Sequence, residues 1–92
     1  MKKRIYKYEL AVTDTQAVTM PEGAEILTVQ AQRGAPCLWA LVNPELRTAE
    51  RQIETFGTGH PVHVDIGVQR NYIGTYQISG GSLVFHVFER VQ

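Results

Sequence analysis

The sequence predicts an all-β fold, a single antiparallel domain over residues 1–92 that is built as a small sandwich or barrel. Roughly six to eight short runs of strand-forming residues follow one another and are separated by turn residues, which is typical of both architectures. The last two runs flank a pair of adjacent glycines, as in a β-hairpin. A chain of 92 residues also leaves no room for a second hydrophobic core.

The C-terminal third of the chain, residues 72–89, predicts that hairpin. Gly80 and Gly81 suit the centre of a two-residue turn, because glycine adopts positive φ without a Cβ clash. The second strand is apolar on both faces except for His86, so we expect it inside a sheet rather than at an edge. The turn sets the register: Ile78 pairs with Leu83, Tyr76 with Phe85 and Gly74 with Val87 on one face, and Gln77 with Val84, Thr75 with His86 and Ile73 with Phe88 on the other.

The N-terminal half predicts four further strands. Residues 4–12 alternate between apolar and polar side chains, which indicates a half-buried strand, and residues 25–32 alternate in the same way. Residues 16–20 can form a short return strand between these two. Residues 37–42 are a continuous apolar run, which favours a central strand that is buried on both sides.

The middle of the chain is less regular. An asparagine before Pro44 can cap a helix, so residues 44–50 form either one short helical turn or a loop. Residues 51–56 alternate as a strand. A glycine-rich turn leads from there to residues 62–66, where apolar side chains at every second position suggest another short extended piece.

Charge and composition exclude several classes of partner. Nine basic and nine acidic residues cancel, so no overall field draws the chain to a nucleic acid polymer or a membrane. A net charge near zero does little to keep copies apart, so we expect a homo-oligomer. Cys37 is the only cysteine, which rules out an intrachain disulfide and fits a reducing compartment. The positive first residues are not followed by the apolar stretch of a signal peptide, so we expect a cytoplasmic protein.

The histidines are the first candidates for chemistry. His60 and His63 are three residues apart, which on a strand places the rings on opposite faces, a poor arrangement for one metal ion. A loop could bring them together with Asp65 or His86, so a small metal-dependent hydrolase built on these four residues is one alternative. The plainer interpretation is that they are turn and sheet-surface residues. Cys37 lies in an apolar strand and no two carboxylates are spaced for acid–base work, so we expect no enzyme, no catalytic residue, no metal and no cofactor.

A glycine-rich turn is the strongest candidate for ligand binding. It consists of Gly57, Thr58, Gly59 and His60. Two glycines around a threonine let successive backbone amides turn toward an anion such as a phosphate. The segment lacks the lysine and the following helix of a P-loop, and its plainer interpretation is a tight turn between two strands.

Arginine and aromatic side chains lie near that turn in the sequence. Arginine binds phosphate through two parallel hydrogen bonds, and an aromatic ring stacks on a nucleobase. The candidates are Arg47, Arg51 and Arg70 for the charge, and Phe56 and Tyr72 for stacking. The alternative is that the arginines are solvated surface residues beside nearby glutamates.

Five segments together resemble a family of small proteins encoded in phage and prophage genomes, and the likeness covers nearly the whole chain. They are residues 20–27 (MPEGAEIL), 36–42 (PCLWALV), 56–61 (FGTGHP), 72–77 (YIGTYQ) and 83–89 (LVFHVFE). The family is described mainly as a domain of unknown function, so it assigns no catalytic residue. The resemblance implies a phage product made inside a bacterium, which places it in the host cell cytoplasm.

That setting leads, by association, to two functional expectations. The first is a phage-encoded counter-defence protein that binds and sequesters a small nucleotide-derived immune signal without cleaving it. The ligand would be of the cyclic dinucleotide or cyclic ADP-ribose type, held in a pocket between copies of the chain. The alternative is a protein–protein inhibitor or virion accessory factor that acts through an exposed β surface.

Overall fold

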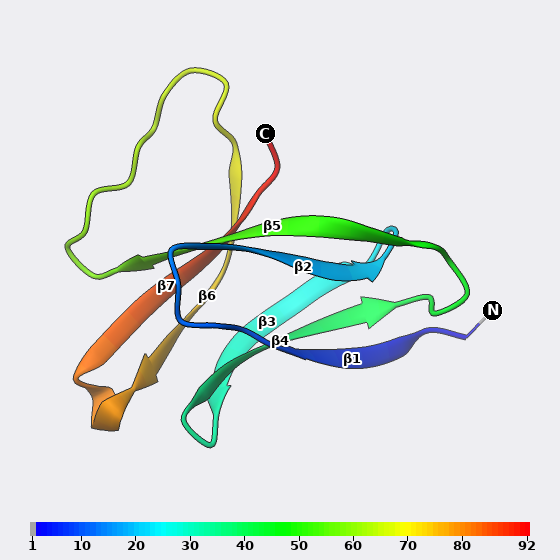
Figure 1. Cartoon of the computed structure of the whole chain (residues 1–92), viewed down its shortest axis with the longest axis horizontal. Coiled ribbons are helices and arrows are strands. Elements are labelled where there is room, and N and C mark those ends of the chain that lie inside the picture. Colours follow the sequence, from blue (N-terminus) through cyan, green and yellow to red (C-terminus); the bar gives the residue numbers. More distant parts are fainter. Residues whose placement is uncertain (1) are drawn as a thin grey trace.

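Seven β-strands form two antiparallel sheets that pack face to face as a sandwich (Figure 1). The structure is a computed structural model that describes residues 2–92. The three-stranded sheet has the order β1–β4–β3, with β1 at Arg4–Glu9, β3 at Glu25–Gln32 and β4 at Ala35–Val42. The four-stranded sheet has the order β2–β5–β7–β6, with β2 at Thr15–Pro21, β5 at Thr48–Gly57, β6 at Arg70–Ile78 and β7 at Leu83–Arg90. The predicted all-β fold is therefore confirmed, and of the two architectures it is the sandwich.

The two sheets enclose a hydrophobic core. β4 is the central strand of its sheet, as predicted for residues 37–42, and its Leu38, Ala40 and Val42 are fully shielded from solvent. The predicted burial on both sides is wrong, because Trp39 and Leu41 on the opposite face are only half-buried. Ile53 of β5 and Val87 of β7 join the same cluster from the four-stranded sheet. Each large apolar side chain buried here stabilises the fold by about 1.5–3 kcal/mol, so this layer holds the sheets together.

The C-terminal hairpin has the predicted turn and most of the predicted register. Gly80 and Gly81 both have positive φ, 66° and 89°, and the Ser82 N–H donates a hydrogen bond to the Ser79 carbonyl at 3.2 Å. Residues Ser79–Gly81 form a short 3-10 turn. The pairs from Ile78–Leu83 to Gly74–Val87 match the prediction, and β7 lies between β5 and β6 rather than at an edge.

The pairing predicted between Ile73 and Phe88 is wrong, because a β-bulge lies between Tyr72 and Gly74. The extra residue changes which side chains of β6 share a face. Ile73 packs against the core, and Tyr72 lies opposite Phe88 instead. Strict alternation would have placed Tyr72 toward the core, so the bulge is what brings this ring to the outer face of the sheet.

Gly74 marks the place where β6 crosses closest to β3. A Cβ at this position would lie 3.0 Å from Val29 Cγ1 and 3.5 Å from the Val29 carbonyl oxygen. The 3.0 Å distance is tighter than ordinary van der Waals contact, so a Cβ here would require Val29 to shift by a few tenths of an ångström.

The first strand is shorter than the predicted range of residues 4–12. β1 ends at Glu9, and the Gln16 side chain then binds both the N–H and the carbonyl of Ala11, at 3.0 and 2.8 Å. These two bonds close the link to β2, because they give the Ala11 backbone the partners that a strand neighbour would supply.

Two segments of the middle are settled by the structure, the first of them predicted as either a helical turn or a loop. Residues 44–50 contain no helical turn: the Asn43 carbonyl accepts from the Leu46 N–H at 3.2 Å, and β5 already begins at Thr48. The extended piece predicted for residues 62–66 is not a strand, since it lies in the loop between β5 and β6, where no neighbouring strand pairs with it. The alternation there reflects exposed side chains rather than a buried face.

Candidate ligand-binding hollow on the outer face of the four-stranded sheet

Three aromatic rings meet on the outer face of the four-stranded sheet. Phe88 of β7 lies between Phe56 of β5 and Tyr72 of β6, with ring centroids 5.8 and 5.3 Å apart. Both contacts are edge-on, which is a favoured arrangement for aromatic pairs. Tyr72 as a residue remains 60% exposed, so the cluster has one open side.

A chain of polar side chains runs beside this aromatic cluster. The Thr58 hydroxyl lies 2.7 Å from His86 Nε2, and the Thr75 hydroxyl lies 2.9 Å from His86 Nδ1. The Tyr72 hydroxyl continues the chain at 2.5 Å from Thr75 Oγ1. A neutral imidazole donates from one nitrogen and accepts at the other, and each hydroxyl can supply the matching partner. Both nitrogens of His86 are thus occupied and its ring is held in place.

The three rings line a hollow of about 230 Å³ together with Thr58 and His86 of the polar chain. Its wall is completed by the turn after β5 and by one residue of the loop that follows. The lining residues are Phe56, Gly57, Thr58, Gly59, His60, Val62, Tyr72, His86 and Phe88. A larger hollow of about 390 Å³ on the three-stranded sheet is lined mainly by charged and amide side chains and has no aromatic surface.

The glycine-rich turn shapes this hollow, but its amides are partly used. The Thr58 N–H donates to the Val84 carbonyl at 3.3 Å, and the His60 N–H donates to the Gly57 carbonyl at 3.0 Å. The imidazole of His60 folds back over Gly57, where a Cβ would lie 3.0 Å from the ring. Gly59 has a φ of 86°, which favours glycine. The turn therefore positions side chains, and two of its amides already have carbonyl partners.

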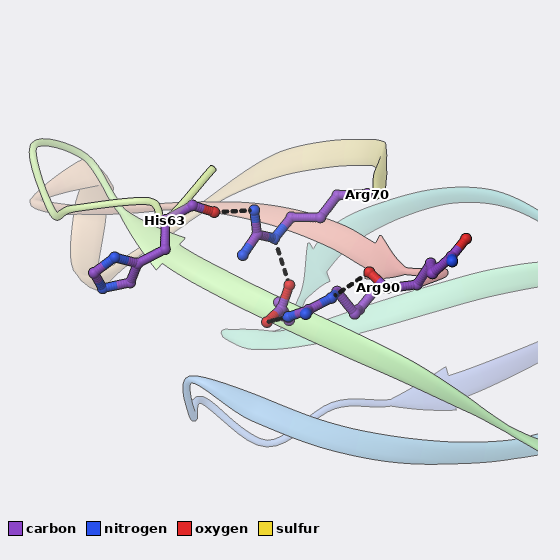
Figure 2. Close-up of polar contacts among 5 residues, drawn as sticks. His63, Arg70 and Arg90 are labelled. Atoms are coloured by element: carbon purple, nitrogen blue, oxygen red, sulfur yellow. Dashed lines mark hydrogen bonds and ion pairs between the residues drawn. The ribbon is translucent and has the colours of Figure 1, made fainter. Parts of the chain in front are cut away.

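The cations beside the hollow are also engaged. The Arg70 guanidinium donates to Glu54 at 2.5 Å and to the His63 carbonyl at 2.7 Å, and it lies 5.3 Å from the centre of the Phe56 ring. Arg90 donates to the other oxygen of Glu54 at 3.3 Å. Figure 2 shows Arg70 beside the carbonyl of His63, whose imidazole points away from it. Two arginines share one carboxylate, so the cluster keeps one net positive charge.

Seven of the nine predicted site residues come together at this face: Phe56, Gly57, Thr58, Gly59, His60, Tyr72 and Arg70. The other two lie elsewhere. Arg47 pairs with Glu22 at 3.0 Å and its side chain is 85% exposed. Arg51 points to the interior, where it forms an ion pair with Glu89 and donates to the Ala24 carbonyl at 2.8 Å. Its hydrogen bond to Glu89 raises the pKa of Arg51 above the usual value.

The comparison with known families covers the whole molecule. Residues 1–92 match the family described as a domain of unknown function, DUF7352. The chain belongs to this family. No curated protein matches the chain, and no solved structure does.

Several residues of this DUF7352 domain join the hollow although the sequence argument did not select them for binding. His86 and Phe88 line it, Thr75 bonds to His86 Nδ1, and Glu54 and Arg90 belong to the charge cluster of Arg70. The hairpin register already placed Thr75 opposite His86, so that pair was within reach of sequence reasoning. Glu54 and Arg90 are 36 residues apart, and no local pattern connects them.

Two histidines of this DUF7352 domain, His60 and His86, line the same hollow. Among residues 2–92, no group of three or more histidine, cysteine, aspartate or glutamate side chains is arranged to hold a metal ion. Both nitrogens of His86 contact threonine hydroxyls instead. Over the same residues, no helix is long and apolar enough to cross a membrane.

Proposed function

We propose that this protein binds a small nucleotide-derived signal in the hollow on its outer face and sequesters it without cleaving it. One observation carries the proposal: the exposed Tyr72 lies in one hollow with the Thr58 hydroxyl, which keeps hydrogen-bonding capacity beyond its contact with His86 Nε2. A nucleobase needs both features, an aromatic surface for stacking and polar groups for its edge.

The size of the hollow favours one base per copy. Pockets that enclose a drug-sized ligand measure about 300–1,000 Å³, and this hollow measures about 230 Å³. A cyclic dinucleotide would therefore insert one base and leave its second half outside. Stacking on an aromatic ring contributes about 1–3 kcal/mol per base, so Tyr72 and the neighbouring Phe88 would supply much of the affinity.

The charges beside the hollow favour phosphate binding at its edge rather than between two arginine side chains. Arg70 and Arg90 share Glu54, so the cluster attracts an anion without presenting a free guanidinium fork. Two amides of the glycine-rich turn already donate to carbonyls. In this proposal the base provides the affinity, and the phosphates face solvent beside Arg70.

The biological setting is part of the proposal and rests on resemblance to phage and prophage proteins. A phage protein in the host cytoplasm could use such a hollow to remove a cyclic dinucleotide or cyclic ADP-ribose signal from the host defence. Sequestration needs tight binding and no chemical step.

The test is native mass spectrometry and calorimetry with a panel of cyclic dinucleotides and cyclic ADP-ribose isomers. We expect intact ligand at a fixed ratio to protein. Tyr72→Ala should weaken binding by about 10- to 100-fold, because it removes the stacking ring, whereas Tyr72→Phe should retain most of it. Arg47→Ala is the matched control, since Arg47 is exposed and pairs only with Glu22 away from the hollow.

Three results would count against the proposal. If no member of the panel binds at ligand concentrations of about 100 µM, the protein does not sequester these small molecules. If Tyr72→Ala binds the ligand as tightly as the original chain does, the binding site is not this hollow. A chemically changed ligand would identify an enzyme.

The loop between β5 and β6 supports a second candidate, the protein–protein inhibitor. Val64 and Ile66 are 84% and 105% exposed, although both side chains are apolar. Exposed apolar side chains on a loop often mark a contact with another protein. Capture of one host protein at stoichiometric ratio by the native chain, and its loss in Val64→Asp and Ile66→Asp, would favour this function over the first.

A further inference from the structure

The two sheets expose four edge strands, and three of them are interrupted. β3 has a register shift between Ile26 and Thr28, and β6 has its bulge between Tyr72 and Gly74. β2 ends in Pro21, which has no N–H to offer. Bulges and proline are devices that prevent an edge from pairing with another strand. β1 pairs with β4 in an unbroken register and contains neither device.

The hydrogen bonds of β1 identify the groups at its free edge. Leu10 continues the register of β1 and donates its N–H to the Pro36 carbonyl of β4 at 2.8 Å. Because hydrogen-bonding direction alternates along a strand, Tyr8 and Tyr6 also direct their backbone groups to β4. The backbone groups of Ile5, Lys7 and Glu9 therefore face the open edge.

Side chains of β1 are also exposed to solvent. Ile5 is 61% exposed and Tyr6 is 38% exposed, and the second sheet does not cover this end of the smaller sheet (Figure 1). Apolar and aromatic side chains on both faces of an edge without bulge or proline favour pairing with a further strand. Lys7, at the centre of β1, restricts this pairing to registers that do not place another cation opposite it.

We propose that β1 pairs antiparallel with β1 of a second copy, about a two-fold axis that passes Tyr6. In this register Tyr6 lies opposite Tyr6 of the partner subunit. Lys3 lies opposite the partner's Glu9, Arg4 opposite the partner's Tyr8, and Ile5 opposite the partner's Lys7. The groups at the free edge then form four hydrogen-bonded pairs, with roughly eight backbone hydrogen bonds, two for each pair.

Charge selects this register over its neighbours. A shift by one step in one direction places Lys7 opposite the partner's Lys7, and a shift in the other places Lys3 opposite the partner's Lys7. Like charges directly opposite each other destabilise a strand pair, whereas Lys3 with the partner's Glu9 and Arg4 with the partner's Tyr8 are attractive pairs. The proposed register contains no like-charge pair directly across the strands.

The result is one continuous sheet of six strands across two copies. One strand per copy is a small interface, so we expect a dissociation constant in the micromolar range, on the order of 1–100 µM. The hollow proposed for ligand lies on the outer face of the other sheet, so the dimer leaves both hollows open. This inference is independent of the proposed ligand.

The first test is sedimentation of the full chain combined with cross-linking. Tyr6→Cys should form a disulfide-linked dimer on mild oxidation, because opposite residues of a non-hydrogen-bonded pair have Cα atoms about 4.5 Å apart, within disulfide range. Arg4→Cys is the matched control. It lies on the same face of β1, but its counterpart in the second copy is about 13 Å away along the strand.

The second test exchanges the charges of the outermost pair. Lys3→Glu and Glu9→Lys should each weaken the dimer by about tenfold, because each places like charges opposite each other twice per dimer. The double variant restores the attraction and should return the dissociation constant to near the original value.

Three outcomes would overturn the proposal. They are a monomer at every concentration up to about 1 mM, equal cross-linking of Tyr6→Cys and Arg4→Cys, and no restoration in the double charge variant. Dimerisation of unchanged strength in each single charge variant would also overturn it, because the interface would then lie elsewhere. Recovery of an acidic extended segment of another protein on β1 would assign the edge to a different partner.

Discussion

The two faces of the four-stranded sheet each carry arginine–glutamate contacts, and they differ in what lies over them. On the inner face, Arg51 binds Glu89 and reaches the Ala24 carbonyl just before β3, so the pair joins one sheet to the other. On the outer face, Glu54 binds Arg70 and Arg90, and Arg70 holds the His63 carbonyl of the loop (Figure 2). Both carboxylates are largely buried, with side chains 11% and 13% exposed.

The carboxylates on the two faces are therefore buried to a similar extent, and they differ in whether the structure that covers them can move. A sheet packed over a charge cannot move aside without unfolding, whereas a loop can open locally and admit water. We expect the inner pair to govern global stability and the outer contacts to govern the shape of the hollow. The predictions below separate these two roles.

The largest expected effect is the loss of the inner partner. Glu89→Ala leaves the Arg51 guanidinium in the interior without its carboxylate, and unpaired buried charges of this kind cost about 3–5 kcal/mol. Urea denaturation of the variant should show this as a lower midpoint with an unchanged slope.

The matched control for that variant removes both charges. Arg51→Met with Glu89→Leu replaces the pair by apolar side chains of similar length and should recover most of the stability. If Glu89→Ala lowers the free energy of unfolding by less than about 1 kcal/mol, the Arg51 guanidinium reaches water. The inner pair would then not govern global stability more than the outer contacts do.

The next effect compares two glycines that meet a neighbour at the same distance. An added Cβ at Gly74 or at Gly57 would lie 3.0 Å from another side chain. At Gly74 the neighbour is the stiff Val29 with its backbone just behind, so Gly74→Ala should cost about 1–3 kcal/mol. At Gly57 it is the exposed ring of His60, which can swing away.

Gly57→Ala should therefore cost less than about 1 kcal/mol in the free energy of unfolding and should change the hollow instead. Thermal unfolding compares the two stabilities, and ligand titration or the His60 ring resonances report the hollow. Equal destabilisation by the two changes would contradict the inference that side chains on the inner face are rigid while those on the outer face can move.

Much of the inner face could be predicted from the sequence. The paired glycines at 80 and 81 fix the hairpin turn, and the apolar run at residues 37–42 identifies the strand at the centre of the smaller sheet. The alternation of residues 51–56 also places Arg51 on the side of Ile53 and opposite Phe56. Its interior position was therefore available from the pattern, although its partner Glu89 is 38 residues away.

The outer face was predicted only in part. Phe56 and the glycine-rich turn follow directly from the strand that precedes them. Tyr72 reaches the hollow through the bulge at Ile73, which exchanges the faces of neighbouring residues and leaves no signal in an alternating pattern. Arg70 holds the loop between β5 and β6 through the backbone carbonyl of His63. Because any residue type has such a carbonyl, the sequence gives no signal for this contact.

Release of the loop should produce a smaller and more local effect. Glu54→Gln keeps the shape of the side chain and removes the charge shared by Arg70 and Arg90. We expect about 1–2 kcal/mol less global stability, because the loop can open and hydrate both guanidinium groups.

Hydrogen exchange measured residue by residue locates that change. Amides in residues 58–69 should exchange faster in Glu54→Gln, while those of β4 should change only by the global amount. Uniform acceleration throughout the chain would show that the outer contacts also hold the sandwich together.

The smallest expected effect appears only at alkaline pH, and it tests how dry the inner face is. Tyr76 is 3% exposed, and its burial raises the pKa of the phenol above the usual value of about 10. Between pH 10 and that higher value, the unfolded chain releases the phenol proton and the folded chain keeps it. The folded state then binds more protons, so stability falls as the pH rises, by at most about 1.4 kcal/mol per pH unit for one group.

Below pH 10 the phenol is protonated in both states and adds no pH dependence. Tyr76→Phe should therefore flatten the decline of stability above pH 10 while leaving the curve between pH 6 and 9 parallel to that of the original chain. Urea midpoints measured across both ranges check this directly. An unchanged alkaline slope would show that water reaches the Tyr76 hydroxyl between the sheets, and the inner face would then yield to solvent as the outer face does.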